Sequence, residues 1–134
     1  MSLAQRMAQI FGILFLIVAV LGFLVSGGSM DANPATAPRV IGLFPVNLLH
    51  NLVHLAFGLW GIFAARMHDS AVLYCRVSGV VYLLLFVLGF IIPSTFGLIP
   101  IGGPDVWLHL VLGAVLAFVG FAAKPYVPEA GLRA

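Results

Sequence analysis

Charged residues are scarce in this sequence: 7% of its 134 residues are Asp, Glu, Lys or Arg, whereas 63% are hydrophobic. Soluble domains carry about 25% charged residues, so this chain cannot cover a surface that faces water. The single cysteine, Cys75, excludes an internal disulfide and any CxxC metal, redox or c-type haem motif. The few cations are scattered, so no basic patch indicates nucleic-acid binding. We therefore expect an integral membrane protein surrounded by a lipid bilayer.

Four apolar segments are long enough to cross about 30 Å of hydrocarbon, which takes roughly 20 helical residues. They cover approximately 6–26, 46–66, 71–92 and 105–123. Pro45 and Pro104 stand where a first helical residue is expected, because a proline there loses no hydrogen bond. Asp69-Ser70 predicts an N-cap for the third helix. The expected fold is all-α, a transmembrane four-helix bundle in which residues 1–134 form one domain.

The first span also has features of a signal peptide, because Arg6 precedes the apolar run and Ala35-Thr36-Ala37 resembles a cleavage site. Pro38 would directly follow the cut, which is unfavourable, and the run has a counterpart in the third span. We expect the first span to be kept as a transmembrane helix.

The chain contains an internal repeat that is clearest at Gly, Pro and His. Three pairs of segments align without internal gaps: 12–23 with 79–90, 42–45 with 97–100, and 54–58 with 109–113. Glycine, proline and histidine do not recur by chance in apolar sequence as readily as Leu and Val do. We therefore predict two helical hairpins, related as parallel repeats by a pseudo-twofold axis along the membrane normal, with His54 equivalent to His109.

The cations predict the orientation. Five cations lie at the N-terminus, in the connection between the second and third spans, and at the C-terminus, which share one side of the membrane: Arg6, Arg66, Arg76, Lys124 and Arg133. Only Arg39 lies on the other side, so the positive-inside rule places both termini in the cytoplasm.

The connections differ in composition. The two outer loops, 27–45 and 93–104, are rich in Gly and Pro yet fairly apolar, and two interpretations stay open: a cap over a cavity, or a loop resting among lipid headgroups. On the cytoplasmic side we expect His68 to be a solvated loop residue. The polar tail 124–134 is expected to have little fixed structure.

Polar side chains collect on one face of the second span and recur in the fourth. The residues are Asn47, His50, Asn51 and His54, followed by Asp105 and His109. Steps of three and four residues place them on one face of each helix, at a shared depth in the outer half of the membrane. A charged residue near the bilayer centre costs about 2.5–3.5 kcal/mol, so these groups should face inward and have partners. The cluster is the best candidate site in the chain.

Several roles are open for this cluster. His50, His54, Asp105 and His109 could bind Zn²⁺ or another transition metal, although Asn51 stands where a zinc protease has its glutamate. His54 and His109 could instead be axial ligands of haem, or hold a chlorophyll magnesium. A proton path is a third role, poorly supported by the few polar residues towards the cytoplasm. In a fourth role, the cluster is a hydrogen-bond network that only holds the helices together, and Asn47 and Asn51 belong to it.

The run Val46-Asn47-Leu48-Leu49-His50-Asn51-Leu52-Val53-His54-Leu55-Ala56-Phe57-Gly58-Leu59-Trp60-Gly61 looks like the signature N-x-x-H-N-x-x-H-L-x-x-G-x-x-G. It resembles a family of small four-helix bacterial membrane proteins classed as a domain of unknown function, family 4383. Tyr82, Gly89 and the later Asp105-x-x-Leu108-His109-Leu110 also fit. The resemblance implies four helices, an unassigned activity, and a bacterial inner membrane or, for a chlorophyll protein, a thylakoid-type one.

Taken together, these patterns favour a non-catalytic accessory or scaffold protein whose outer cluster is a candidate metal site, with other membrane subunits as candidate partners. The alternatives are a haem- or chlorophyll-binding subunit of a redox or photosynthetic complex, and a small metal-dependent membrane oxidoreductase.

Overall fold

The computed structural model describes residues 1–125, which form four helices and little else. The elements are α1 (Leu3–Ser26), β1 (Arg39–Val40), β2 (Phe44–Pro45), α2 (Leu48–Ala64), α3 (His68–Ile91), the short 3-10 helix η1 (Thr95–Gly97) and α4 (Pro104–Ala122). Helices α1, α3 and α4 are long and apolar enough to cross a membrane, whereas α2 has 17 residues and is shorter. The predicted all-α, four-helix membrane fold is confirmed.

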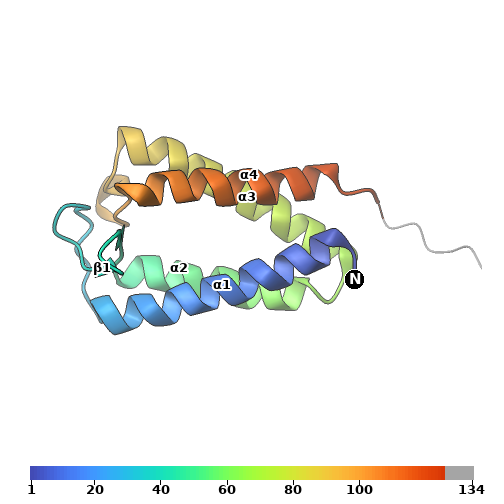
Figure 1. The fold of residues 1–134 in the computed structure, drawn as a ribbon, viewed down its shortest axis with the longest axis horizontal. Coiled ribbons are helices and arrows are strands. Elements are labelled where there is room, and N and C mark those ends of the chain that lie inside the picture. Colours follow the sequence, from blue (N-terminus) through green and yellow to red (C-terminus); the bar gives the residue numbers. More distant parts are fainter. Residues whose placement is uncertain (126–134) are drawn as a thin grey trace, which may run out of the picture.

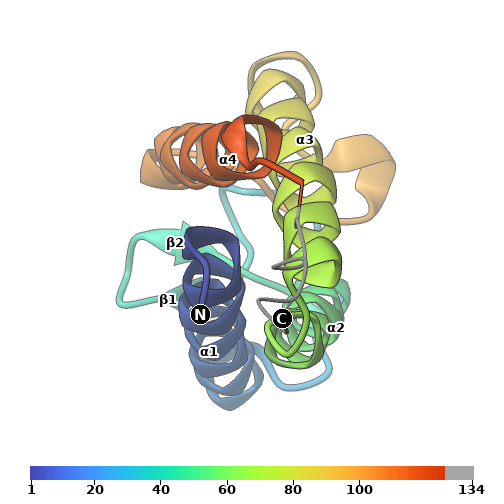
Figure 2. The same ribbon diagram turned by 90° about the vertical axis from the view of Figure 1, so that its right-hand side faces the viewer.

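The helices pack as two hairpins (Figure 1). Helix α1 contacts α2 along its length, and α3 contacts α4 in the same way, while contacts between the hairpins are fewer. Seen from the end that carries the N-terminus, α1 and α4 lie on one side of the bundle and α2 and α3 on the other (Figure 2). We call this end the terminal end, and the opposite end, with β1, β2 and η1, the loop end.

Glycines let the helices within each hairpin approach closely. A side chain added at any of four glycines would lie within 3 Å of a backbone nitrogen in the partner helix. The pairs are Gly12 with Ile62, Gly58 with Leu16, Gly79 with Ala117, and Gly113 with Leu83. Close backbone approach is how helices associate where lipid is as apolar as their own side chains.

The beginnings of the helices test three predictions. Pro104 is at the start of α4, as predicted. Pro45 is not helical, because it lies in β2 opposite Arg39, and Asn47 caps α2 by accepting the backbone N–H of His50 at 2.9 Å. The predicted Asp69-Ser70 cap is wrong as well: α3 begins earlier, after Met67, and Asp69 lies in its first turn.

The terminal end is held together by side chains from three segments. Gln5 donates from Nε2 to the carbonyl of Ala65 at 3.0 Å, which joins the start of α1 to the end of α2. His68 contacts Ser2 Oγ through Nδ1 at 2.8 Å and the carbonyl of Lys124 through Nε2 at 2.9 Å. His68 is therefore a bridge between chain segments and not the solvated loop residue that we expected. The polar tail from 126 onward, including Arg133, lies outside the described residues.

Candidate functional site

A cavity of about 310 Å³ lies near the loop end of the bundle. One side of it is polar and is formed by residues from α2, α3 and α4: His50, His54, Tyr82, Asp105 and His109. The other walls are apolar and come mainly from α1 and α4: Leu14, Phe15, Val18, Leu21, Leu108 and Leu112. The structure thus brings the four predicted metal-site residues to one cavity.

The β1–β2 hairpin covers the cavity at the loop end. Val40, Ile41 and Phe44 from this hairpin line it, together with Val46. The hairpin lies on the α1 and α4 side of the bundle in Figure 2. The first outer loop therefore caps a cavity, which is one of the two interpretations that the sequence left open for the outer loops.

The backbone fixes which nitrogen of two histidines carries hydrogen. His54 Nδ1 lies 3.0 Å from the carbonyl oxygen of His50, and His109 Nδ1 lies 2.7 Å from that of Asp105. A carbonyl oxygen only accepts, so each Nδ1 donates, and the Nε2 of a neutral ring keeps a lone pair. His54 Nε2 uses its lone pair to accept from the Tyr82 hydroxyl at 3.2 Å.

Tyr82 lies at the centre of the cluster, although it was not among the predicted site residues. Its ring stacks on Phe15, with centroids 5.2 Å apart and planes 5° apart, and on His109, with centroids 5.2 Å and planes 24° apart. One signal could have identified it: the repeat aligns Tyr82 with Phe15, so α3 carries a hydroxyl where α1 has none.

Two polar atoms of cavity-lining residues have no hydrogen-bond partner among residues 1–125: His50 Nδ1 and Asp105 Oδ2. Both residues are well buried, with 5% and 3% of their surface exposed. A buried polar atom left unpaired costs about 1–3 kcal/mol, so such atoms call for an explanation in the function of a protein.

Asn47 and Asn51, the other two predicted members, bond elsewhere. Asn47 donates from Nδ2 to the carbonyl of Leu98 at 2.8 Å and so joins the start of α2 to the second outer connection. Asn51 donates from Nδ2 to Ser26 Oγ at 2.8 Å and ties α2 to α1. Neither lines the cavity, and both act as links between elements.

The metal ligands predicted from spacing are close together but do not surround a common point. In the part of the chain that the structure describes, no group of three or more His, Cys, Asp or Glu side chains is placed to hold a metal ion. Both nitrogens of His54 are engaged, by His50 and by Tyr82. The rings of His50 and His54 lie against each other with centroids 4.2 Å apart. The metal site stays a prediction.

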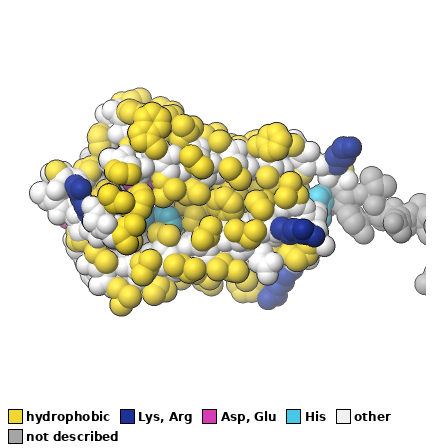
Figure 3. All heavy atoms as spheres, viewed as in Figure 1, with side chains coloured by type: hydrophobic (Ala, Val, Ile, Leu, Met, Phe, Trp, Pro, Cys, Tyr) yellow, Lys and Arg dark blue, Asp and Glu magenta, His cyan; other side chains and the backbone are white. Residues whose placement is uncertain are grey.

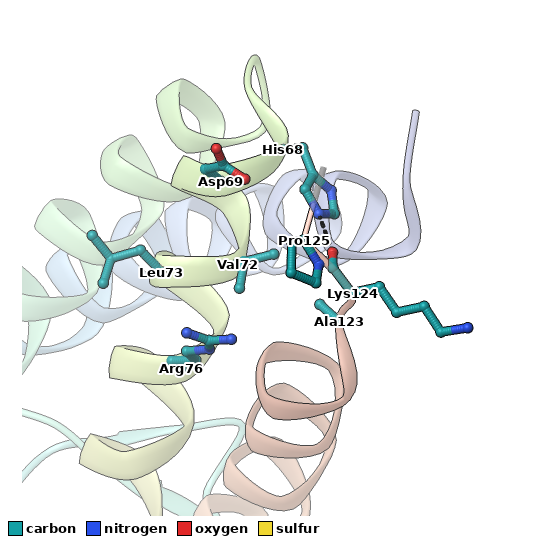
Figure 4. A pocket seen from close by; sticks show the side chains of 8 residues that line it. All are labelled: His68, Asp69, Val72, Leu73, Arg76, Ala123, Lys124 and Pro125. Atoms are coloured by element: carbon teal, nitrogen blue, oxygen red, sulfur yellow. Dashed lines mark hydrogen bonds between the residues drawn. The ribbon is translucent and has the colours of Figure 1, made fainter. Parts of the chain in front are cut away.

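A second hollow of about 300 Å³ lies at the terminal end between the start of α3 and the end of α4 (Figure 4). Arg76 is held there by donating from Nε to the carbonyl of Gly120 at 2.8 Å. The ammonium of Lys124 extends away from Arg76 and Asp69 in this view. Because these charged groups do not converge, the loop-end cavity is the better candidate site.

Comparison with known proteins gives a family but no assigned activity. No curated protein and no solved structure matches the chain. The model of the family described as "Domain of unknown function (DUF4383)" matches residues 5–122, which include all four helices and the whole cluster. The chain belongs to this family of unknown function, as the signature in α2 indicated.

Proposed function

We propose that this chain is a non-catalytic membrane protein that binds a small lipid-soluble molecule in its loop-end cavity. The observation that carries the proposal is the cavity itself, which is mostly apolar and has among its lining residues His50 and Asp105, each with one buried atom that lacks a hydrogen-bond partner. Ligand sites are typically apolar hollows of about 300–1,000 Å³ with a few converging polar groups.

The proposed route into the cavity is from the bilayer, between α1 and α4. These helices contact each other far less than the helices within each hairpin do. Wall residues Leu14, Leu21 and Leu108 are 45%, 41% and 38% exposed, which places them at an opening on the side of the bundle. In Figure 3, part of a histidine side chain is visible between apolar side chains near the loop end.

Binding fits the cavity better than the other roles do. A tetrapyrrole held between His54 and His109 would have to displace Tyr82, which stacks on one imidazole and bonds the other.

The proposal includes the predicted repeat and orientation. The four close glycine contacts support the repeat, because they fall at positions that the alignment makes equivalent. The stacked pair Phe15 and Tyr82 is equivalent in the same way and would lie on the pseudo-twofold axis. Of the described cations, Arg39 is at the loop end and the others are near the terminal end, as Figure 3 shows for that face. The cavity would then lie in the outer half of the membrane.

The experiment is a binding measurement in lipid nanodiscs with 4-hexylphenol and hexylbenzene as probes and empty nanodiscs as the partitioning control. We expect saturable binding of 4-hexylphenol that Val18→Trp abolishes, because Val18 lines the cavity. Val20→Trp is the matched control, since Val20 is on the same helix but 58% exposed and outside the cavity lining. Equal binding by the two variants would overturn the proposal.

A further inference from the structure

We infer that the molecule bound in this cavity carries a hydroxyl group on a single ring, and that this hydroxyl bonds His109 and Asp105 while an apolar tail extends between α1 and α4. The inference rests on the proposed function and names the chemical class of its ligand.

His109 supplies a hydrogen-bond acceptor. Its Nδ1 donates to the carbonyl of Asp105 at 2.7 Å, so Nε2 of the neutral ring has a lone pair and no hydrogen. In His54 the corresponding lone pair accepts the hydroxyl of Tyr82, a phenol, at 3.2 Å. The chain therefore already holds one phenol on one of these imidazoles, and the other has the same tautomer.

Asp105 supplies the second contact. Its Oδ1 lies 3.5 Å from His109 Nδ1, whereas Oδ2 is buried without a hydrogen-bond partner in the described chain. A hydroxyl has one hydrogen and two lone pairs, so it can donate to His109 Nε2 and accept from Asp105 Oδ2 when that carboxyl carries a proton. A ketone only accepts and cannot use the His109 lone pair. A carboxylate would bring a second acid to the side of Asp105.

The size and lining of the cavity favour a ring. An engineered protein cavity of about 150 Å³ binds benzene, and this one, at about 310 Å³, is twice as large. Phe15, Phe44 and Tyr82 contribute aromatic surface to its walls, and aromatic rings pack favourably against one another. The opening between α1 and α4 leaves a path for a tail into the bilayer.

The test compares the two probes, which differ only in the hydroxyl. We expect wild-type protein in nanodiscs to bind 4-hexylphenol about tenfold more tightly than hexylbenzene after correction with empty discs, as two added hydrogen bonds of ordinary strength would give. His109→Phe keeps a ring to stack on Tyr82 but loses the acceptor. Its preference for 4-hexylphenol should fall, because only the contact with Asp105 remains, while Ser78→Ala, a buried polar change outside the cavity lining, should keep the full preference.

The outcomes separate the two claims. If both probes bind equally to wild type and Val18→Trp abolishes both, the hydroxyl inference is overturned and the binding function stands. If neither probe binds, the proposed function fails as well. An undiminished preference in His109→Phe also overturns the inference, as does tighter binding of 4-hexylbenzylamine than of 4-hexylphenol. Should His109→Phe not fold by circular dichroism, Asp105→Leu, which leaves no polar group, gives the second reading: a preference unchanged there contradicts the proposed contact.

Discussion

The two hairpins use the same backbone contacts but carry different side chains. In the α1–α2 hairpin, a side chain on Gly12 would meet the backbone of Ile62, and in the α3–α4 hairpin one on Gly79 would meet that of Ala117. Where the first hairpin has Phe15, His50 and Asn51, the alignment places Tyr82, Asp105 and Val106 in the second.

This difference separates positions that build the bundle from positions that give it chemistry. The glycines are alike in both hairpins because each pair of helices has to pack in lipid. The polar groups differ because each hairpin supplies a different part of one cluster. Asn51 in the first bonds Ser26 across to α1, whereas Val106 in the second packs on Gly89. Only the combination of both hairpins forms the cavity.

The largest effect is expected from the glycine contacts. A methyl group at Gly79 would lie 2.4 Å from the nitrogen of Ala117, and one at Gly12 would lie 2.8 Å from that of Ile62. We expect Gly79→Ala to destabilise by about 3 kcal/mol and Gly12→Ala by less, since overpacking costs roughly 1–3 kcal/mol. Thermal unfolding in mild detergent measures both. Gly28→Ala, with no neighbouring atom within 4 Å, is the control, and equal stability of Gly79→Ala and Gly28→Ala would show that the hairpin contact is not close.

Asn51 and Val106 occupy equivalent positions in the two hairpins, and giving each position the other's residue should cost unequal amounts of stability. Val106→Asn places an amide at a site that is 6% exposed, opposite Gly89 and Ile101, and leaving it unpaired costs about 1–3 kcal/mol. Asn51→Val removes the bond to Ser26, a loss of about 0.6–1.7 kcal/mol for a bond between membrane helices. Unfolding midpoints of the two variants decide the order. If Asn51→Val were the less stable, Asn51 would contribute more than this one bond.

Tyr82→Phe makes the centre of the second hairpin resemble the first. It removes the hydroxyl that joins α3 to His54 of α2 and should cost about 0.6 kcal/mol, the average for such bonds in a membrane protein. The stacking on Phe15 and His109 needs only the ring and should remain. Tyr74→Phe controls for loss of a buried hydroxyl away from the cavity. A larger loss from Tyr74→Phe than from Tyr82→Phe would argue against a bridging role for Tyr82.

The smallest effect is expected in the first outer connection. The Thr36 hydroxyl donates to Asp31 at 2.7 Å and the backbone N–H of Asn33 donates to it at 2.9 Å, and these bonds lower the pKa of Asp31. A lowered pKa means that the turn gains stability above the ordinary pKa of an aspartate and loses it as the pH falls through the lowered value. Thr36→Val should therefore raise the pKa of Asp31 towards its ordinary value.

An NMR titration of the Asp31 carboxyl group measures this shift. The second connection should show no such dependence, because residues 93–104 contain no Asp or Glu and the Thr95 side chain bonds the backbone of Ile99. An unchanged pKa in Thr36→Val would show that the Thr36 bond does not form in solution.

The sequence predicts the helices well because apolar length and glycine spacing are local properties. The grouping of polar residues on one face of each helix follows from the same periodicity, and His50, His54, Asp105 and His109 do line one cavity. The spacing of residues along the sequence could not predict which distant residues contact one another in the folded chain. The sequence places Pro45 in a helix, because its pairing opposite Arg39 depends on the hairpin turn and is not visible locally. It places His68 in solvent, because its partners Ser2 and Lys124 are distant in sequence.

The apolar wall of the cavity was also beyond sequence analysis. Val18 and Phe44 are ordinary lipid-compatible residues, and nothing in their type separates a cavity wall from a surface that faces lipid. Their role appears only when α1, α4 and the β1–β2 hairpin are placed together.

The most direct measurement is ¹⁵N NMR of the histidine rings in nanodiscs, with and without 4-hexylphenol. We predict that His54 and His109 are both neutral with hydrogen on Nδ1, and that the probe shifts the Nε2 signal of His109 while leaving that of His54 in place. Signals that stay unchanged at saturating 4-hexylphenol, or a hydrogen on His109 Nε2, would contradict the contact between the ligand hydroxyl and His109.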